Sequence, residues 1–155
     1  MGTEIERKYL VTGESWRKQA DGGTAFRQGY LVGAEHASVR VRIEGERANL
    51  NIKSATLGVQ RQEYEYPIPL DDAREMLDTL CEKPLIEKTR YLIVHEGYTW
   101  EVDVFEGDNA GLVVAEVELA AEDEQPPLPD WAGEEVSHDP RYYNVCLVKH
   151  PYKDW

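Results

Sequence analysis

Hydrophobic and charged residues alternate along eight segments of this chain, and that pattern restricts its fold more than any other feature. Alternation with a period of two is typical of a β-strand buried on one face. Tight turn sequences, such as those at Gly45 and Gly97, separate several segments and favour antiparallel hairpins. The predicted strands are Thr3–Val11, Ala25–Val32, Ser38–Glu44, Arg47–Ser54, Val59–Pro67, Ile86–His95, Thr99–Phe105 and Leu112–Leu119.

Two helices are predicted to cover the apolar faces of this sheet. Between Asp71 and Cys81 the apolar residues recur at helical spacing. Asp72, with Glu75 three residues later, resembles a capping box at the start of that helix. A shorter helix is predicted over Glu14–Ala20. No repeat or linker interrupts the 155 residues, so we expect one domain over residues 1–155.

The polar faces of the strands carry charge almost throughout, in pairs two residues apart. Acidic and basic pairs segregate by strand, with Glu4, Glu6, Glu116 and Glu118 in one group and Arg40, Arg42, Lys88 and Arg90 in the other. One interpretation is a solvated sheet face with cross-strand ion pairs. The other is a sheet closed with its charged face inward, which gives a lumen with carboxylates on one wall and cations on another.

Such a lumen suits a polyphosphate bridged by a metal ion. Carboxylates bind hard divalent cations such as Mg²⁺ or Mn²⁺, and Arg and Lys bind phosphate oxygens. Because like charges at close range are costly, the lumen is expected to be hydrated or filled by ligand. The implied chemistry is metal-assisted attack of water on phosphorus.

The formal net charge of −13 argues against non-specific binding to nucleic acid or to an anionic membrane. The most apolar stretch, 111–121, is short and contains two glutamates, so no transmembrane helix is predicted. The N-terminus lacks the apolar stretch of a signal peptide. Cys81 and Cys146 show no metal-binding spacing and are expected to be reduced. We therefore expect a cytoplasmic protein with no nucleic-acid or membrane partner; its oligomeric state is left open.

Glu4, Glu6 and Lys8 form an ExExK motif. Further motifs follow in order along nearly the whole chain, at Arg27–Leu31, Val39–Arg42, Ile52–Ser54, Arg61–Glu65, Glu87–Tyr91, Val102–Phe105, Glu116–Glu118, Gly133–Val136 and Asp139–Asn144. This ordered set resembles the CYTH, or triphosphate tunnel metalloenzyme, family, and most of all its short bacterial members, which hydrolyse inorganic triphosphate. The resemblance implies an α+β fold: an eight-stranded antiparallel β-barrel tunnel with a charged interior, flanked by helices.

The resemblance also implies roles for individual residues. It implies Mg²⁺ or Mn²⁺ bound by Glu4, Glu6, Glu116 and Glu118, with Glu63, Glu65 and Asp103 as further candidates. It implies phosphate binding by Lys8, Arg40, Arg42, Lys53, Lys88 and Arg90. Lys8 and Tyr30 are the expected catalytic pair near the scissile phosphate. After Asn144 the chain is less polar than is usual in the family, which leaves open how the tail closes the tunnel.

The predicted function is therefore hydrolysis of a small-molecule substrate, inorganic triphosphate, to pyrophosphate and phosphate. Alternatives are an adenylate cyclase of the class IV type, a thiamine triphosphatase, or a non-catalytic module that binds polyphosphate or nucleotide. Arg7 has the opposite parity to Lys8 and is expected outside the tunnel. Arg61 is expected either to line the lumen or to neutralise Glu63, and Tyr30 has the alternative of a purely structural role.

Overall fold

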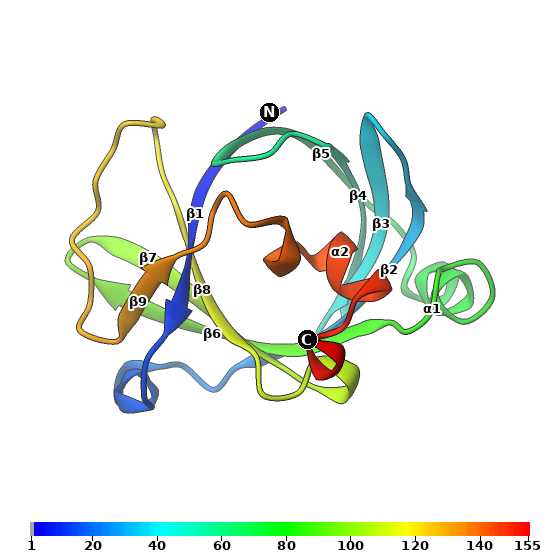
Figure 1. The fold of residues 1–155 in the computed structure, drawn as a ribbon. Coiled ribbons are helices and arrows are strands. Elements are labelled where there is room, and N and C mark those ends of the chain that lie inside the picture. Colours follow the sequence, from blue (N-terminus) through cyan, green and yellow to red (C-terminus); the bar gives the residue numbers. More distant parts are fainter. Residues whose placement is uncertain (1) are drawn as a thin grey trace.

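The structure, a computed structural model that describes residues 2–155, contains a closed antiparallel β-barrel (Figure 1). The strands follow the order β5-β4-β3-β2-β6-β7-β8-β1, and pairing of Thr3–Ile5 with Gln60–Gln62 closes the ring from β1 to β5. The predicted eight-stranded barrel with flanking helices is therefore confirmed. Its strands are β1 (Thr3–Val11), β2 (Thr24–Gly33), β3 (Ala37–Glu44), β4 (Arg47–Ser54), β5 (Gln60–Pro67), β6 (Ile86–His95), β7 (Tyr98–Phe105) and β8 (Val113–Glu118).

A ninth strand, β9 (Ala132–Glu135), was not predicted. It pairs with β1 through Tyr9 and Val11, at the part of the β1 edge that lies beyond β5. The chain then crosses the bore of the barrel as the 3₁₀ turn Pro140–Tyr142 and the helix α2 (Asn144–Lys149), as Figure 1 shows in orange and red. A last 3₁₀ turn, Tyr152–Asp154, ends the chain.

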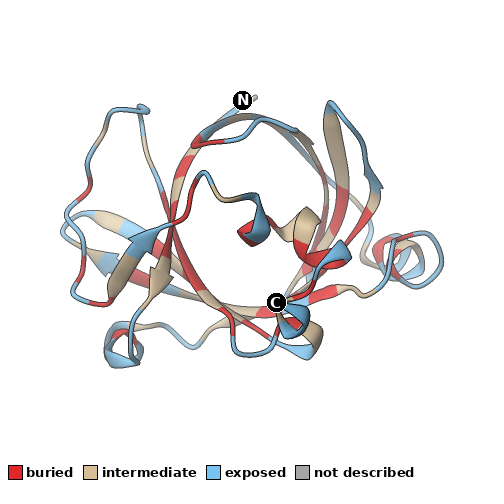
Figure 2. Ribbon diagram, viewed as in Figure 1, coloured by how far each residue is buried: buried red, intermediate tan, exposed pale blue. Residues whose placement is uncertain are grey.

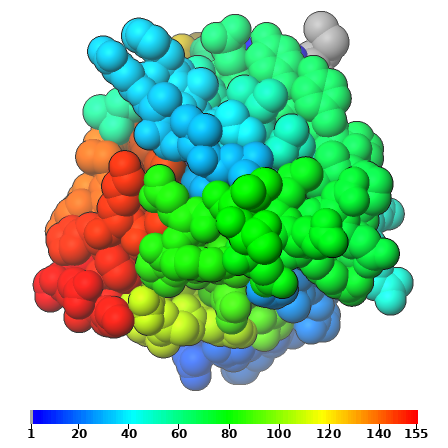
Figure 3. All heavy atoms as spheres, turned by 90° about the vertical axis from the view of Figure 1, so that its right-hand side faces the viewer, coloured from blue at the N-terminus to red at the C-terminus, as the bar shows by residue number. Residues whose placement is uncertain are grey.

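Helix α1 (Leu70–Thr79) packs on the outside of β3 and β4, where Ala73 and Leu77 are fully buried. It starts after Pro69, and no side chain caps it, so the predicted capping box at Asp72 and Glu75 is wrong. Because the helix begins at Leu70, Asp72 lies inside its first turn, where a negative charge interacts favourably with the positive end of the helix dipole. The space-filling view shows α1, in green, covering this side of the barrel (Figure 3).

The predicted helix at 14–20 is a 3₁₀ turn, Ser15–Gln19, that buries Trp16 against Tyr91. Trp131 packs edge-on against Trp100. Buried residues recur along the strands and at the centre of the C-terminal segment (Figure 2). Cys81 and Cys146 are both free. No helix within residues 2–155 is long and apolar enough to cross a membrane.

Candidate active site

The barrel contains a cavity whose wall is charged. The alternation therefore reflects closure with the charged face inward, and not a flat solvated sheet. Twelve of the predicted charged residues and Tyr30 line the cavity: Glu4, Glu6, Lys8, Arg40, Arg42, Lys53, Glu63, Glu65, Lys88, Arg90, Glu116 and Glu118. The wall also includes Ser38, Arg61, Glu101, Tyr143, Asn144 and Val145, to which the sequence assigned no site role beyond the alternatives given for Arg61.

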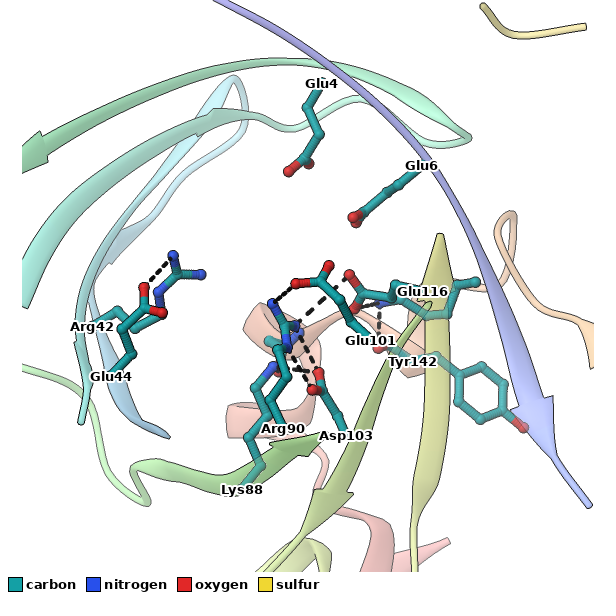
Figure 4. Close-up of polar contacts among 12 residues, drawn as sticks. Glu4, Glu6, Arg42, Glu44, Lys88, Arg90, Glu101, Asp103, Glu116 and Tyr142 are labelled. Atoms are coloured by element: carbon teal, nitrogen blue, oxygen red, sulfur yellow. Dashed lines mark hydrogen bonds and ion pairs between the residues drawn. The ribbon is translucent and has the colours of Figure 1, made fainter. Parts of the chain in front are cut away.

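Three carboxylates converge on one side of the cavity. Glu6 comes from β1, Glu101 from β7 and Glu116 from β8, and one oxygen of each lies within 4.8 Å of the others. Strand register explains the cluster, because Glu116 stands directly opposite Glu101, while Glu6 pairs with Glu118, two residues along the same strand. Figure 4 shows Glu4 pointing towards the same space.

The carboxylates of this cluster compete for ionisation. Burial, followed by the charges of Glu116 and Glu4, raises the pKa of Glu6 well above its usual value. Burial also raises the pKa of Glu101 to about 7, although Arg90 opposes the shift. Burial acts against ionisation of Glu116 as well, but Lys8 and Arg90 hold its pKa below the usual value. Three converging carboxyl groups that cannot all ionise unaided fit a hard divalent cation, whose charge would stabilise the ionised forms.

Two cations of the opposite wall, Lys53 and Arg42, are already paired with carboxylates. Lys53 Nζ lies 3.1 Å from Glu4 Oε1 and 3.4 Å from Glu63 Oε2. Arg42 Nη2 lies 3.4 Å from Glu65 Oε2 and also contacts Glu44. Each cation is therefore held towards the cavity by groups that an incoming phosphate would replace.

Asp103 occupies a different position from the one predicted. It is fully buried, is absent from the cavity wall, and forms hydrogen bonds of 2.7 Å with Lys88 Nζ and of 2.7 and 2.9 Å with Arg90 Nε and Nη2. Burial alone would raise the pKa of Asp103, but Arg90 and Lys88 lower it. Glu101, two residues earlier on the same face of β7, takes the position that faces the cavity. Asp103 supports the two cations from behind.

Lys8 and Tyr30 both line the cavity, but within residues 2–155 no hydrogen bond joins them. Lys8 Nζ donates to the Tyr142 carbonyl at 3.1 Å and lies 3.8 Å from Glu116. Arg7 lies off the cavity wall and pairs with Glu135 at 3.1 Å, as its parity predicted. Arg61 lines the cavity, and its ion-pair partner is Glu6, at 3.6 Å, in place of Glu63.

Sequence reasoning missed Glu101 and Tyr143 as wall residues. Glu101 shares the inward parity of Asp103, so the alternation contained its signal, but the family motif directed attention to Asp103. Tyr143 lies within the predicted motif Asp139–Asn144, yet nothing in the sequence shows that this segment enters the barrel.

Comparison with known proteins agrees with this architecture. The CYTH domain profile matches residues 2–143. An inorganic triphosphatase from Acetivibrio thermocellus is 50% identical over 155 residues, covering 100% of this chain and 99% of the relative. An inorganic triphosphatase from Nitrosomonas europaea is 39% identical over 153 residues, covering 94% and 97%. A crystal structure of an inorganic triphosphatase superposes with a TM-score of 0.65 at 38% identity, over 96% of this chain and 95% of that one.

Proposed function

Because this chain belongs to the CYTH domain family, we propose that it hydrolyses inorganic triphosphate to pyrophosphate and phosphate. The observation that carries the proposal is the cavity inside the closed barrel, where a carboxylate cluster faces a set of Lys and Arg side chains. The two full-length relatives that share 50% and 39% of its sequence are named for this activity.

Glu6, Glu101 and Glu116 are the residues we propose to hold a divalent metal, with Glu4 and Glu118 beside them on the cavity wall. All are oxygen ligands, which suits Mg²⁺ or Mn²⁺. When bound, such an ion supplies Lewis-acid polarisation of phosphate oxygens. Glu63 and Glu65 lie on the wall next to Lys53 and Arg42, so we assign them to the orientation of those cations.

The cations bind and orient the triphosphate. Arg40, Arg42 and Lys53 enter from β3 and β4, and Lys88 and Arg90 enter from β6, so these cations line one continuous part of the wall, along which a chain of phosphates can bind. Lys8, fixed between Glu116 and the Tyr142 carbonyl, provides a positive charge beside the carboxylate cluster. There it stabilises the charge that develops as water attacks the terminal phosphorus and pyrophosphate leaves. Tyr30 borders the same space.

The test is turnover by the purified protein with triphosphate, ATP and thiamine triphosphate, each with Mg²⁺, with Mn²⁺ and with EDTA. We expect release of phosphate from triphosphate that EDTA abolishes. Arg42→Ala should reduce the rate, whereas Arg47→Ala, a change at an exposed residue of the same hairpin, serves as the matched control. Binding of triphosphate without any product would support a non-catalytic binding module instead.

An apolar pocket favours a second candidate substrate class. It is lined by residues such as Ala34, Leu57 and Cys146, and shares Arg61 and Tyr143 with the charged cavity. An organic group attached to a triphosphate would find apolar surface there, as adenosine or thiamine triphosphate requires. The same panel decides between them: a higher kcat/KM for an organic triphosphate, or formation of cyclic AMP, would replace the first proposal.

A further inference from the structure

Tyr143 lies where the C-terminal segment meets the charged cavity. Its ring faces two cations of the wall, with Lys8 Nζ 5.3 Å and Arg61 Cζ 4.8 Å from the ring centroid. The side chain is buried, and the residue lines the cavity. Cations at this distance from an aromatic face are attracted by the ring, and the attraction increases when water is excluded.

The hydroxyl of Tyr143 fixes the ring in this place. It accepts a hydrogen bond from the Gly58 backbone N–H at 3.0 Å and donates one to the Ser137 carbonyl at 2.8 Å. Gly58 belongs to the connection between β4 and β5, and has a φ of +116°, which a side chain would strain. Both partners are backbone groups of separate segments, so the position of the ring does not depend on flexible side chains.

The two cations in turn hold the carboxylate cluster. Lys8 Nζ lies 3.8 Å from Glu116, and Arg61 Nη2 lies 3.6 Å from Glu6. Each of these cations therefore has the Tyr143 ring on one side and a carboxylate of the proposed metal site on another. A ring that contacts both cations limits where each can move when substrate displaces its carboxylate.

We propose that Tyr143 is a positioning residue: its aromatic ring holds Lys8 and Arg61 in the direction from which they bind the triphosphate. This inference rests on the proposed function. The two parts of the side chain have different roles, because the ring contacts the cations and the hydroxyl anchors the ring.

The experiment compares Tyr143→Leu, which removes ring and hydroxyl, with Tyr143→Phe, which keeps the ring. Tyr152→Phe, in the same C-terminal segment but outside the cavity wall, is the control. We expect Tyr143→Leu to lower kcat/KM for triphosphate at least about tenfold, which corresponds to about 1.4 kcal/mol. Tyr143→Phe should melt at a lower temperature than the wild type, yet recover kcat/KM to within about threefold at temperatures where it is folded.

Pyrophosphate affinity, measured by calorimetry in the presence of Mg²⁺, adds a readout that does not need turnover. We expect weaker binding by Tyr143→Leu and near wild-type binding by Tyr143→Phe. A folded Tyr143→Leu with wild-type kcat/KM, or a folded Tyr143→Phe as impaired as the Leu variant, would overturn the role of the ring. Absence of turnover by the wild type would instead refute the proposed function, and the calorimetry would still test the positioning of the cations.

Discussion

Replacement of Asp103 by Asn tests whether this residue supports the cavity from behind. Asp103 is fully buried, and its three hydrogen bonds, of 2.7, 2.7 and 2.9 Å, all come from Lys88 and Arg90. Asn keeps the shape and removes the charge, and one of its two terminal atoms is an N–H₂ donor that faces a cation in place of an acceptor. Lys88 is 2% exposed, so its ammonium would stay buried without the carboxylate that now lies 2.7 Å from it, and the Asn144 side-chain oxygen is 3.5 Å away.

The expected cost follows from that burial. Removing one partner of a buried ion pair costs about 3–5 kcal/mol, because the other charge stays buried without compensation. For a chain of this length each kcal/mol lowers the melting temperature by about 2–4 °C, so Asp103→Asn should melt about 6–20 °C below the wild type. The assay is thermal unfolding in EDTA, followed by circular dichroism.

Glu101→Gln is the matched control, two residues away on the same face of β7 but on the cavity wall. We expect no loss of stability from it in EDTA at pH 8, because the cavity-facing carboxyl is costly to ionise. If Asp103 bound metal, as the family resemblance implied, Asp103→Asn would have the melting temperature of the wild type in EDTA. It would lose only the rise in melting temperature that metal causes. That result would refute our reasoning.

Three further predictions concern the cavity itself. Glu6→Gln should lower metal-dependent turnover at least about tenfold. Its melting temperature in EDTA should be unchanged or higher, because the raised pKa of Glu6 already favours the neutral form of this carboxyl group. Turnover near that of the wild type at saturating metal would contradict this prediction. Arg42→Ala should lower kcat/KM about a hundredfold with little change in stability, because burial and the charge of Arg40 already disfavour the charged form of Arg42. Kinetics and thermal melting of the same sample test this prediction. Lower stability with unchanged kcat/KM would instead favour a structural ion pair. Glu101 has a pKa of about 7 in the folded chain against 4.5 when unfolded, so its contribution to the unfolding free energy is full below pH 4.5 and is lost as the pH rises through 7. In EDTA, the melting temperature of Glu101→Gln relative to that of the wild type should therefore rise from pH 5 to pH 8. A difference that stays constant would contradict this prediction.

The strands could be predicted from sequence because each has its own alternation of apolar and charged residues. All eight barrel strands lie within one residue of their predicted ends. Strand β9 has no such signal, since Ala132, Gly133, Glu134 and Glu135 do not alternate. It becomes a strand because the edge of β1 beyond β5 offers unpaired backbone groups, a property of the assembled barrel and not of the segment.

Alternation also predicts which face a side chain occupies but not its depth. Glu101 and Asp103 share a face of β7, yet register places Asp103 opposite Arg90 and Glu101 opposite Glu116. The first position is a buried ion pair and the second is part of the carboxylate cluster. Register between three neighbouring strands, which no single segment encodes, decides between a supporting carboxylate and one that faces the cavity.

The charge balance of the cavity explains why metal and substrate should bind together. Its wall carries seven carboxylates and seven Lys or Arg side chains, so the formal charges cancel, and several are paired between strands that lie close together in the barrel. A triphosphate that bound alone would take the cations from their carboxylates and leave those carboxylates facing one another. A divalent cation that bound alone would draw the carboxylates away from Lys8 and Arg61. When both bind, each relieves the repulsion that the other creates, and by linkage each raises the affinity for the other by the same factor.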